Sequence, residues 1–177
     1  MPSRRVHVCL DSQCLSYLVD AMSVTSAPVG DLAEQQLALF RCFLYRPGGF
    51  HVTPTVTAEC GRIRNAARLA LHSSYSQTLI GETRPIDQRQ IDARTRSLQT
   101  FHSDADDCRI LAEAEDGSLS VMLTFDTRLI NRLGQHTSVR LVRPVDFWVS
   151  LNIPRGSKPV TAPRADNPLS LESWWQW

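Results

Sequence analysis

The sequence lacks the features that mark secreted, membrane-embedded or strongly charged proteins. It has no C-x-x-C pair, no apolar run long enough to span a bilayer, and no secretory hydrophobic segment at its start. Its formal net charge is only +1, so charge alone indicates no nucleic-acid or membrane partner. An odd number of cysteines argues against a disulfide framework, and we expect a reduced, cytoplasmic protein. The five cysteines are Cys9, Cys14, Cys42, Cys60 and Cys108.

Lysine is almost absent. Lys158 is the only one, and the other residues in the Lys and Arg total are all arginines. A gene rich in G and C would produce this bias. The functional alternative is that arginine is favoured because its guanidinium binds phosphate bidentately, which a lysine does not do.

The segments that are present predict an α/β fold. The chain has 177 residues, of which 42% are hydrophobic, enough for one domain with a core. Continuous apolar runs and helical spacings alternate, which favours a central parallel β-sheet flanked by helices. The predicted strands cover 6–10, 50–53, 120–124 and 138–142. The predicted helices cover 12–21, 32–45 (capped by Asp31), 55–71, 85–99, 103–116 (capped by Ser103), 128–133 and 144–151.

The composition changes after residue 151. We predict one domain over 1–151 and a Pro- and Trp-rich tail over 152–177, which ends in "WWQW". Three indoles in four residues would form an exposed apolar patch in a monomer, so something should cover them. The cover is either their own domain, a second copy in a homodimer, or a partner protein. Stacking on RNA bases is a fourth alternative.

Two acidic residues follow buried strands directly. Asp11 comes after "VHVCL", and Asp126 comes just after "SVMLT", within "LTFD". Ligands of an open parallel sheet bind beyond the carboxyl ends of its strands. Asp11 and Asp126 are therefore expected at the same edge of the sheet.

Two further acids head apolar stripes on predicted helices. Asp107 begins such a stripe on the helix from Ser103, and Glu59 does so on the helix after Pro54. A carboxylate at the head of an apolar stripe is costly unless something pairs with it. Helices that follow strands start at the edge where the strands end, so all four acids are expected to converge. The two stripes consist of Ile110, Leu111 and Ala114, and of Ile63, Ala66 and Ala70.

A cluster of four carboxylates repels itself, which raises each pKa unless a cation neutralises the charge. Hard divalent cations such as Mg²⁺ or Mn²⁺ prefer these oxygen ligands. Asp104 is a further candidate ligand, and Thr124 is either a positioning hydroxyl or an ordinary strand residue. The alternative for each acid is a separate helix cap or surface charge. Three arginines beyond Glu59 either follow a phosphate backbone or form a solvated helix face. They are Arg62, Arg64 and Arg68.

The order of these segments resembles the PIN-domain nucleases, including the VapC-type toxins. The resemblance covers about residues 6–151 and rests on "DSQCL", "TPTVTAECGRI", "DCRILAEA", "LTFD" and "PVDF". It implies a metal-dependent endonuclease, usually acting on RNA, with one or two Mg²⁺ or Mn²⁺ ions. An antitoxin is then a candidate protein partner. The acids implied are Asp11, Glu59, Asp107 and Asp126, with Asp104 as a further ligand and with Ser12 and Thr124 in support.

Three other interpretations compete with a nuclease. A haloacid-dehalogenase-type phosphatase needs a second acid two residues after the first, and Gln13 occupies that position. A PIN-like binding or scaffold protein without catalysis is a second alternative. A protein that recruits partners through its tryptophan-rich tail is a third. Chelator-sensitive RNA cleavage separates the nuclease from the last two.

Overall fold

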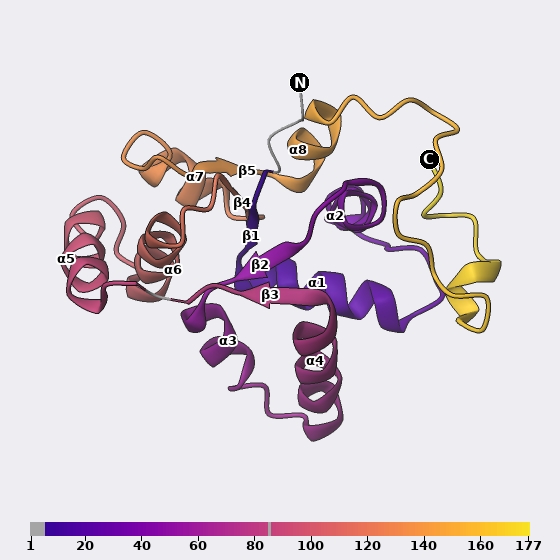
Figure 1. The fold of residues 1–177 in the computed structure, drawn as a ribbon, viewed down its shortest axis with the longest axis horizontal. Helices are drawn as coiled ribbons and strands as arrows, with labels where there is room; N and C mark the ends of the chain where they lie inside the picture. The colour runs from indigo at the N-terminus through magenta and orange to yellow at the C-terminus, as the bar shows by residue number, and fades with distance from the viewer. Residues whose placement is uncertain (1–5, 85) are drawn as a thin grey trace.

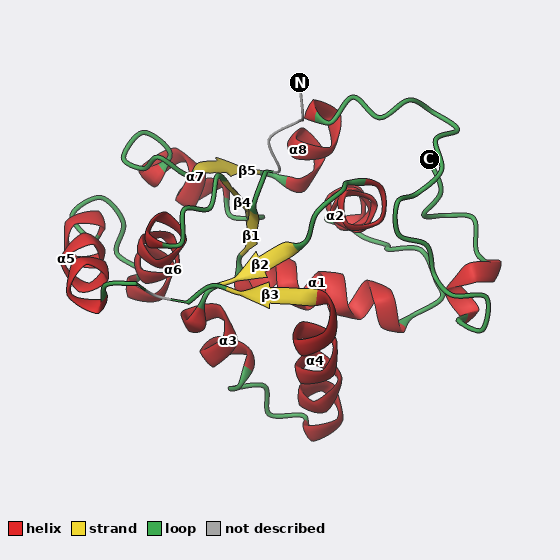
Figure 2. Cartoon of the chain, viewed as in Figure 1, coloured by secondary structure: helices red, strands yellow, loops and turns green. Residues whose placement is uncertain are grey.

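The structure is a computed structural model that describes residues 6–84 and 86–177. In these residues five strands form one parallel sheet with the order β3-β2-β1-β4-β5. The predicted α/β class is therefore confirmed (Figure 2). The strands are β1 (Val8–Leu10), β2 (Phe50–Val52), β3 (Ile80–Glu82), β4 (Val121–Leu123) and β5 (Arg140–Val142).

Helices cover both faces of this sheet. Successive side chains of a strand point to opposite faces, and every residue of β1 and β4 is buried. Figure 1 shows α6 and α7 beside β4 and β5, with α5 on the outer side of α6, and α3 and α4 beside β2 and β3. The helices are α1 (Ser12–Ser23), α2 (Ala33–Tyr45), α3 (Pro54–Cys60), α4 (Ala66–Leu79), α5 (Gln88–Leu98), α6 (Ala105–Asp116), α7 (Thr127–Leu133) and α8 (Pro144–Ser150). None of the helices in the described part of the chain is long and apolar enough to cross a membrane.

The single helix predicted over 55–71 is wrong, because the structure has two helices there. The first, α3, ends at Cys60, and Asn65 caps the second by accepting a hydrogen bond from the Arg68 backbone N–H at 2.9 Å. An asparagine side chain that satisfies a free amide in this way starts a new helix. Ala66 and Ala70 therefore lie on a different helix from Glu59, and the apolar stripe predicted below that acid does not exist.

Some local features also differ from the prediction. The strand β3 was not predicted, since three residues with Gly81 at the centre give no apolar pattern. Asp31 does not cap α2, whose N-cap is Leu32 without a side-chain hydrogen bond. The cap of α6 is Asp104 rather than Ser103, because the Asp104 carboxylate reaches two free amides. Residue 85, where the next helix was predicted to begin, lies outside the described residues.

The C-terminal tail folds back on its own domain, beside α2 and α8. The indole N–H of Trp174 donates to the Thr25 carbonyl at 2.7 Å, and the backbone N–H of Trp177 donates to the Tyr45 hydroxyl at 2.9 Å. Trp175 is buried, with 5% of its surface exposed. Of the alternatives for covering the indoles, the structure adopts the first. The tail contains one short 3₁₀ helix, η1 (Pro168–Leu171).

Candidate active site

The order in which the chain adds strands reverses direction between β1 and β4. From β1 the chain adds β2 and β3 on one side, then returns to add β4 and β5 on the other side (Figure 1). Ligands of open α/β sheets bind outside the carboxyl ends of the strands at such a switch of direction. Asp11 follows β1, and its backbone N–H donates to the Leu123 carbonyl of β4 at 3.2 Å. The two strand ends are thereby held together.

Asp11 is buried just past the end of β1, with 8% of its surface exposed. It is the N-cap of α1, and its Oδ1 accepts a hydrogen bond from the Cys14 backbone N–H at 2.6 Å. The pKa of this carboxyl is raised from 3.8 to about 6, mainly by burial, and the negative charge of Asp107 contributes to the rise. Hydrogen bonds from Thr124 and Cys14 act in the opposite direction. Asp11 therefore caps α1 and is also a carboxyl group whose ionised form is disfavoured by burial.

Thr124 connects the two strand-end acids. It is fully buried, and its Oγ1 accepts a hydrogen bond from the Asp126 backbone N–H at 3.0 Å. The same side chain also lowers the pKa of Asp11, because its hydroxyl favours the charged carboxylate. These contacts give the hydroxyl a positioning geometry in addition to its place in the sheet.

Glu59 lies on α3, and its side chain contacts the start of α1. The Ser12 hydroxyl donates to Glu59 Oε2, which links α3 to the start of α1. Burial raises the pKa of Glu59, and the negative charges of Asp106 and Asp107 add to this effect. Ser12 therefore positions an acid from a different helix.

Asp107 lies in the first turn of α6, where its Oδ2 is 2.8 Å from His102 Nε2. Burial raises its pKa, and the charges of Asp104 and Asp126 raise it as well, while the hydrogen bond with His102 lowers it. Asp107 interacts electrostatically with two other acids of the group, because its charge raises the pKa of both Asp11 and Glu59.

Asp104 and Asp126 are helix caps. Asp104 Oδ1 accepts from the backbone N–H groups of Asp106 and Asp107, at 2.9 and 3.2 Å. Asp126 Oδ1 caps α7 by accepting from Arg128 at 2.7 Å and from Leu129 at 3.2 Å. In both residues the helix cap uses one carboxylate oxygen, Oδ1. The negative charges of both acids still act on Asp107, whose pKa they raise.

The arginines beyond Glu59 have different surroundings. Arg62 is exposed and pairs with Asp106 at 3.2 Å. Arg64 is exposed in the segment between α3 and α4. Arg68 pairs with Asp20 of α1 at 2.9 Å. Arg62 is the arginine of the three that contacts a neighbour of the acid cluster.

The donor set fits a hard divalent cation in its chemistry. The charge of Asp107 raises the pKa of both Asp11 and Glu59, and the charges of Asp104 and Asp126 raise the pKa of Asp107, as expected for acids near one edge. Within residues 6–84 and 86–177, however, no three His, Cys, Asp or Glu side chains are placed closely enough to hold a metal ion. Metal ligation therefore requires side-chain rotation at this edge.

Two residues that support the acids were missed by sequence reasoning. His102 contacts Asp107. In the sequence, only its position just before the acidic segment could have indicated this contact. Glu113 of α6 is buried and accepts hydrogen bonds from the backbone N–H and hydroxyl of Thr55, at 3.1 and 2.9 Å. It therefore holds the first turn of α3, the helix that carries Glu59. An acid within "ILAEAE" gave no sign of a partner so distant in sequence.

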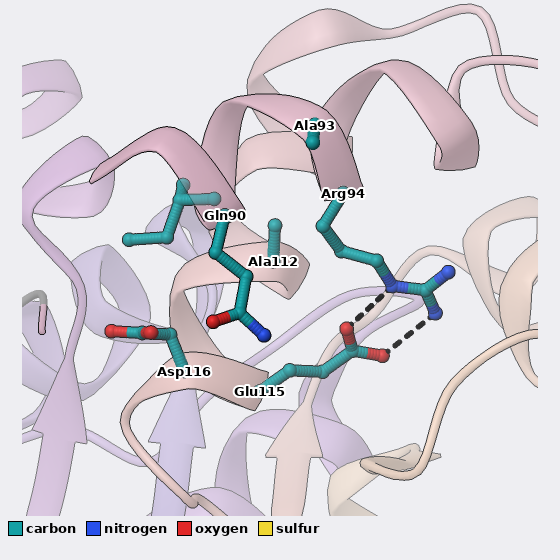
Figure 3. A pocket seen from close by; sticks show the side chains of 7 residues that line it. Gln90, Ala93, Arg94, Ala112, Glu115 and Asp116 are labelled. Carbon is teal, nitrogen blue, oxygen red and sulfur yellow. Dashed lines mark hydrogen bonds and ion pairs between the residues drawn. The ribbon is translucent and has the colours of Figure 1, made fainter. Parts of the chain in front are cut away.

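A separate hollow of about 440 Å³ lies between α5 and α6, at the C-terminal end of α6 (Figure 3). Its acid Glu115 is paired bidentately with Arg94, at 2.6 and 2.9 Å. The pair and the Thr137 hydroxyl, which donates to Glu115 at 2.6 Å, lower the pKa of Glu115 even though burial alone would raise it. With both carboxylate oxygens engaged, this hollow is a structural contact between helices.

Comparison with known proteins gives little beyond the fold. No protein-family model matches the chain, and no curated protein matches its sequence. Among solved structures, the chain is similar to the crystal structure of FitAcB from Neisseria gonorrhoeae, with 15% sequence identity and a TM-score of 0.49. The similarity covers 77% of this chain and 97% of the other. At this identity and TM-score, the likeness carries no conclusion about function.

Proposed function

We propose that this protein is a metal-dependent endonuclease of the PIN type that hydrolyses phosphodiester bonds of RNA. The observation that carries the proposal is that the pKa values of Asp11, Glu59 and Asp107 are all raised, and that the charge of Asp107 contributes to the rise at Asp11 and Glu59. Acids whose pKa is raised by burial and by a neighbouring charge are typical of functional sites. The motif resemblance supplies the reaction class.

The proposed ligands of Mg²⁺ or Mn²⁺ are Asp11, Glu59, Asp107 and Asp126, with Asp104 as an additional ligand. When bound, such an ion activates a water and neutralises charge on the phosphate. The chain's own groups position the carboxylates: Thr124 orients Asp11, Ser12 orients Glu59, and His102 orients Asp107. Asp11 and Asp126 each engage one oxygen in a helix cap.

For the substrate, we propose that Arg62 and Arg64 contact the phosphate backbone. Both are exposed and lie directly after the helix that carries Glu59. Arg68 is a weaker candidate because it pairs with Asp20 of α1, whereas the partner of Arg62 is Asp106, next to Asp107 in the first turn of α6. The resemblance to VapC-type proteins further suggests the toxin of a toxin–antitoxin pair, with an antitoxin or a second copy as protein partner. All five cysteines are free thiols, in keeping with a cytoplasmic location.

The test is cleavage of total RNA by the purified protein with Mg²⁺ or Mn²⁺, with and without EDTA. Asp11→Asn and Asp107→Asn should each lower the rate at least about 100-fold, since the loss of even an outer-shell partner of a metal costs about 10–100-fold. Asp146→Asn, which changes an exposed acid on α8, is the matched control and should cleave as wild type does. Cleavage that continues in EDTA, or at full rate in both Asn variants, would contradict the proposal.

A binding or scaffold protein is the second candidate. It is favoured by the finding that no three metal-ligating side chains are grouped in the described part of the chain. RNA binding without cleavage in either metal would establish this alternative. The same purified samples serve for both measurements.

A further inference from the structure

Two histidines face each other on neighbouring strands, away from the acids. His7 directly precedes β1, and His51 is the central residue of β2, paired in parallel register with Cys9. Residues two apart in a strand point to the same face, which places His7 and His51 on one side of the sheet. His7 Nδ1 lies 3.3 Å from His51 Nε2, and the ring centroids are 5.3 Å apart.

This separation of the nitrogens equals that of two imidazoles bound to one metal ion. Two Zn–N bonds of about 2.0–2.1 Å at a tetrahedral angle place their nitrogens about 3.3–3.4 Å apart. We infer that His7 and His51 form a two-histidine site for a borderline divalent ion such as Zn²⁺, Ni²⁺ or Cu²⁺, with water completing the coordination. Imidazole nitrogen suits these ions, whereas Mg²⁺ and Mn²⁺ prefer oxygen.

The position of the His51 ring depends on a glycine, Gly81, on the neighbouring strand β3. His51 pairs with Gly81 of β3, and a Cβ on Gly81 would lie 2.9 Å from His51 Nδ1. Glycine thus leaves room for the ring with Nε2 directed toward His7. The backbone of three adjacent strands therefore sets where the two rings lie.

Both rings would bind as neutral imidazoles. In the hydrogen bond between them one nitrogen donates and the other accepts. On binding, the donor ring moves its proton to its second nitrogen, and no proton is lost overall. The guanidinium of Arg46, stacked on Phe50 with its carbon 5.4 Å from the ring centroid, carries a positive charge that reaches His51. It weakens cation binding without occupying either nitrogen.

The site is independent of the proposed nuclease centre. His7 precedes the first residue of β1, and Asp11 follows its last residue. An ion held by His7 and His51 would cross-link β1 to β2. Because the two histidines are not adjacent in the unfolded chain, the ion would stabilise the folded state.

The test is a titration of the full-length protein with ZnCl₂, followed by NMR of the histidine ring nitrogens and by thermal unfolding. The signals of His7 and His51 should shift together at about one equivalent of zinc, as expected for one shared ion. MgCl₂ in excess should leave both unchanged. His72 and His136, which lie away from the proposed ligands of the acid cluster, serve as internal references.

Three variants make the test specific. His7→Ala removes a ligand from an exposed position, and zinc affinity at the pair should fall at least about tenfold. Gly81→Ala removes no ligand but displaces the His51 ring, and it should weaken zinc binding as well. His136→Ala is the control and should bind as wild type does. Zinc that shifts only one ring, that binds only at thiols or carboxylates, or that binds His7→Ala with unchanged affinity at His51 would overturn the inference.

Discussion

Asp11 makes opposite contributions to stability and to the proposed chemistry. Its pKa is raised from 3.8 to about 6 in the folded protein, so its ionisation destabilises the fold. The folded state holds this proton more tightly than the unfolded state, and stability therefore falls as pH rises from about 4 to about 6 and stays low above that. Without metal, Asp11→Asn should stabilise the protein at pH 7.5 by on the order of 1–3 kcal/mol.

This gain should shrink below pH 6 and vanish near pH 4, where both states of the wild-type carboxyl bind the proton. Asparagine retains the cap of α1, because it is as good an N-cap as aspartate. The measurement is urea unfolding in EDTA across this pH range. Asp31→Asn, at an exposed acid outside the cluster, should show no such gain. A variant that is more stable yet inactive would also show that lost cleavage is not due to unfolding.

At the scale of elements, Glu113 joins α6 to α3. Its carboxylate accepts two hydrogen bonds from Thr55 and lies 3.3 Å from Arg109 Nε. Glu113→Ala would leave the buried Thr55 amide and hydroxyl without this acceptor, while Arg109, whose side chain is partly exposed, would keep its pairing with Asp92. We expect a loss of roughly 2–4 kcal/mol in the free energy of unfolding. Because α3 carries Glu59, RNA cleavage should fall as well.

Chemical denaturation and the cleavage assay together test whether the Glu113–Thr55 contact holds α3 against α6. Glu113→Gln keeps the shape and should lose less stability than Glu113→Ala. Glu34→Ala, at an exposed acid in the first turn of α2, is the control and should be nearly neutral. Equal stability of Glu113→Ala and wild type would show that the contact does not hold the two helices together.

At the scale of the whole molecule, the tail covers the face formed by α2 and α8. Arg41 of α2 donates to the backbone carbonyls of Trp174, Trp175 and Gln176. The guanidinium groups of Arg41 and Arg155 lie over the Trp177 ring, 5.0 and 4.4 Å from its centroid, and the rings of Trp177 and Trp148 form a T-shaped pair. These contacts indicate that the tail belongs to the folded domain.

Deletion of residues 169–177 should therefore cost stability and leave RNA cleavage within about twofold of the full-length rate. Loss of a buried tryptophan alone costs about 3–5 kcal/mol, and each kcal/mol lowers Tm by about 2–4 °C in a chain of this size. Leu171→Ala, at a side chain that is 87% exposed within the same segment, is the control. A truncated protein of unchanged Tm that loses cleavage would place the tail in the substrate site.

The features that the sequence alone determined depend on residues that are close to one another in the chain. Buried strands appeared as continuous apolar runs, and the acids Asp11 and Asp126 were placed at the ends of β1 and β4. A helix cap joins residues within about four positions, so the acids that act as caps could be recognised as candidates for that role. Where two local signals competed, as at Ser103 and Asp104, the prediction chose the wrong cap.

Only the tertiary structure decided which distant residues meet. The switch of direction between β1 and β4, the burial that raises the pKa of Asp11, and the support of α3 by Glu113 all join residues far apart in the chain. The same holds for the tail on α2. Burial and charge at these sites depend on strand order and helix packing. A local pattern does not specify them, because the free energy of desolvation is set by whatever the rest of the chain brings alongside.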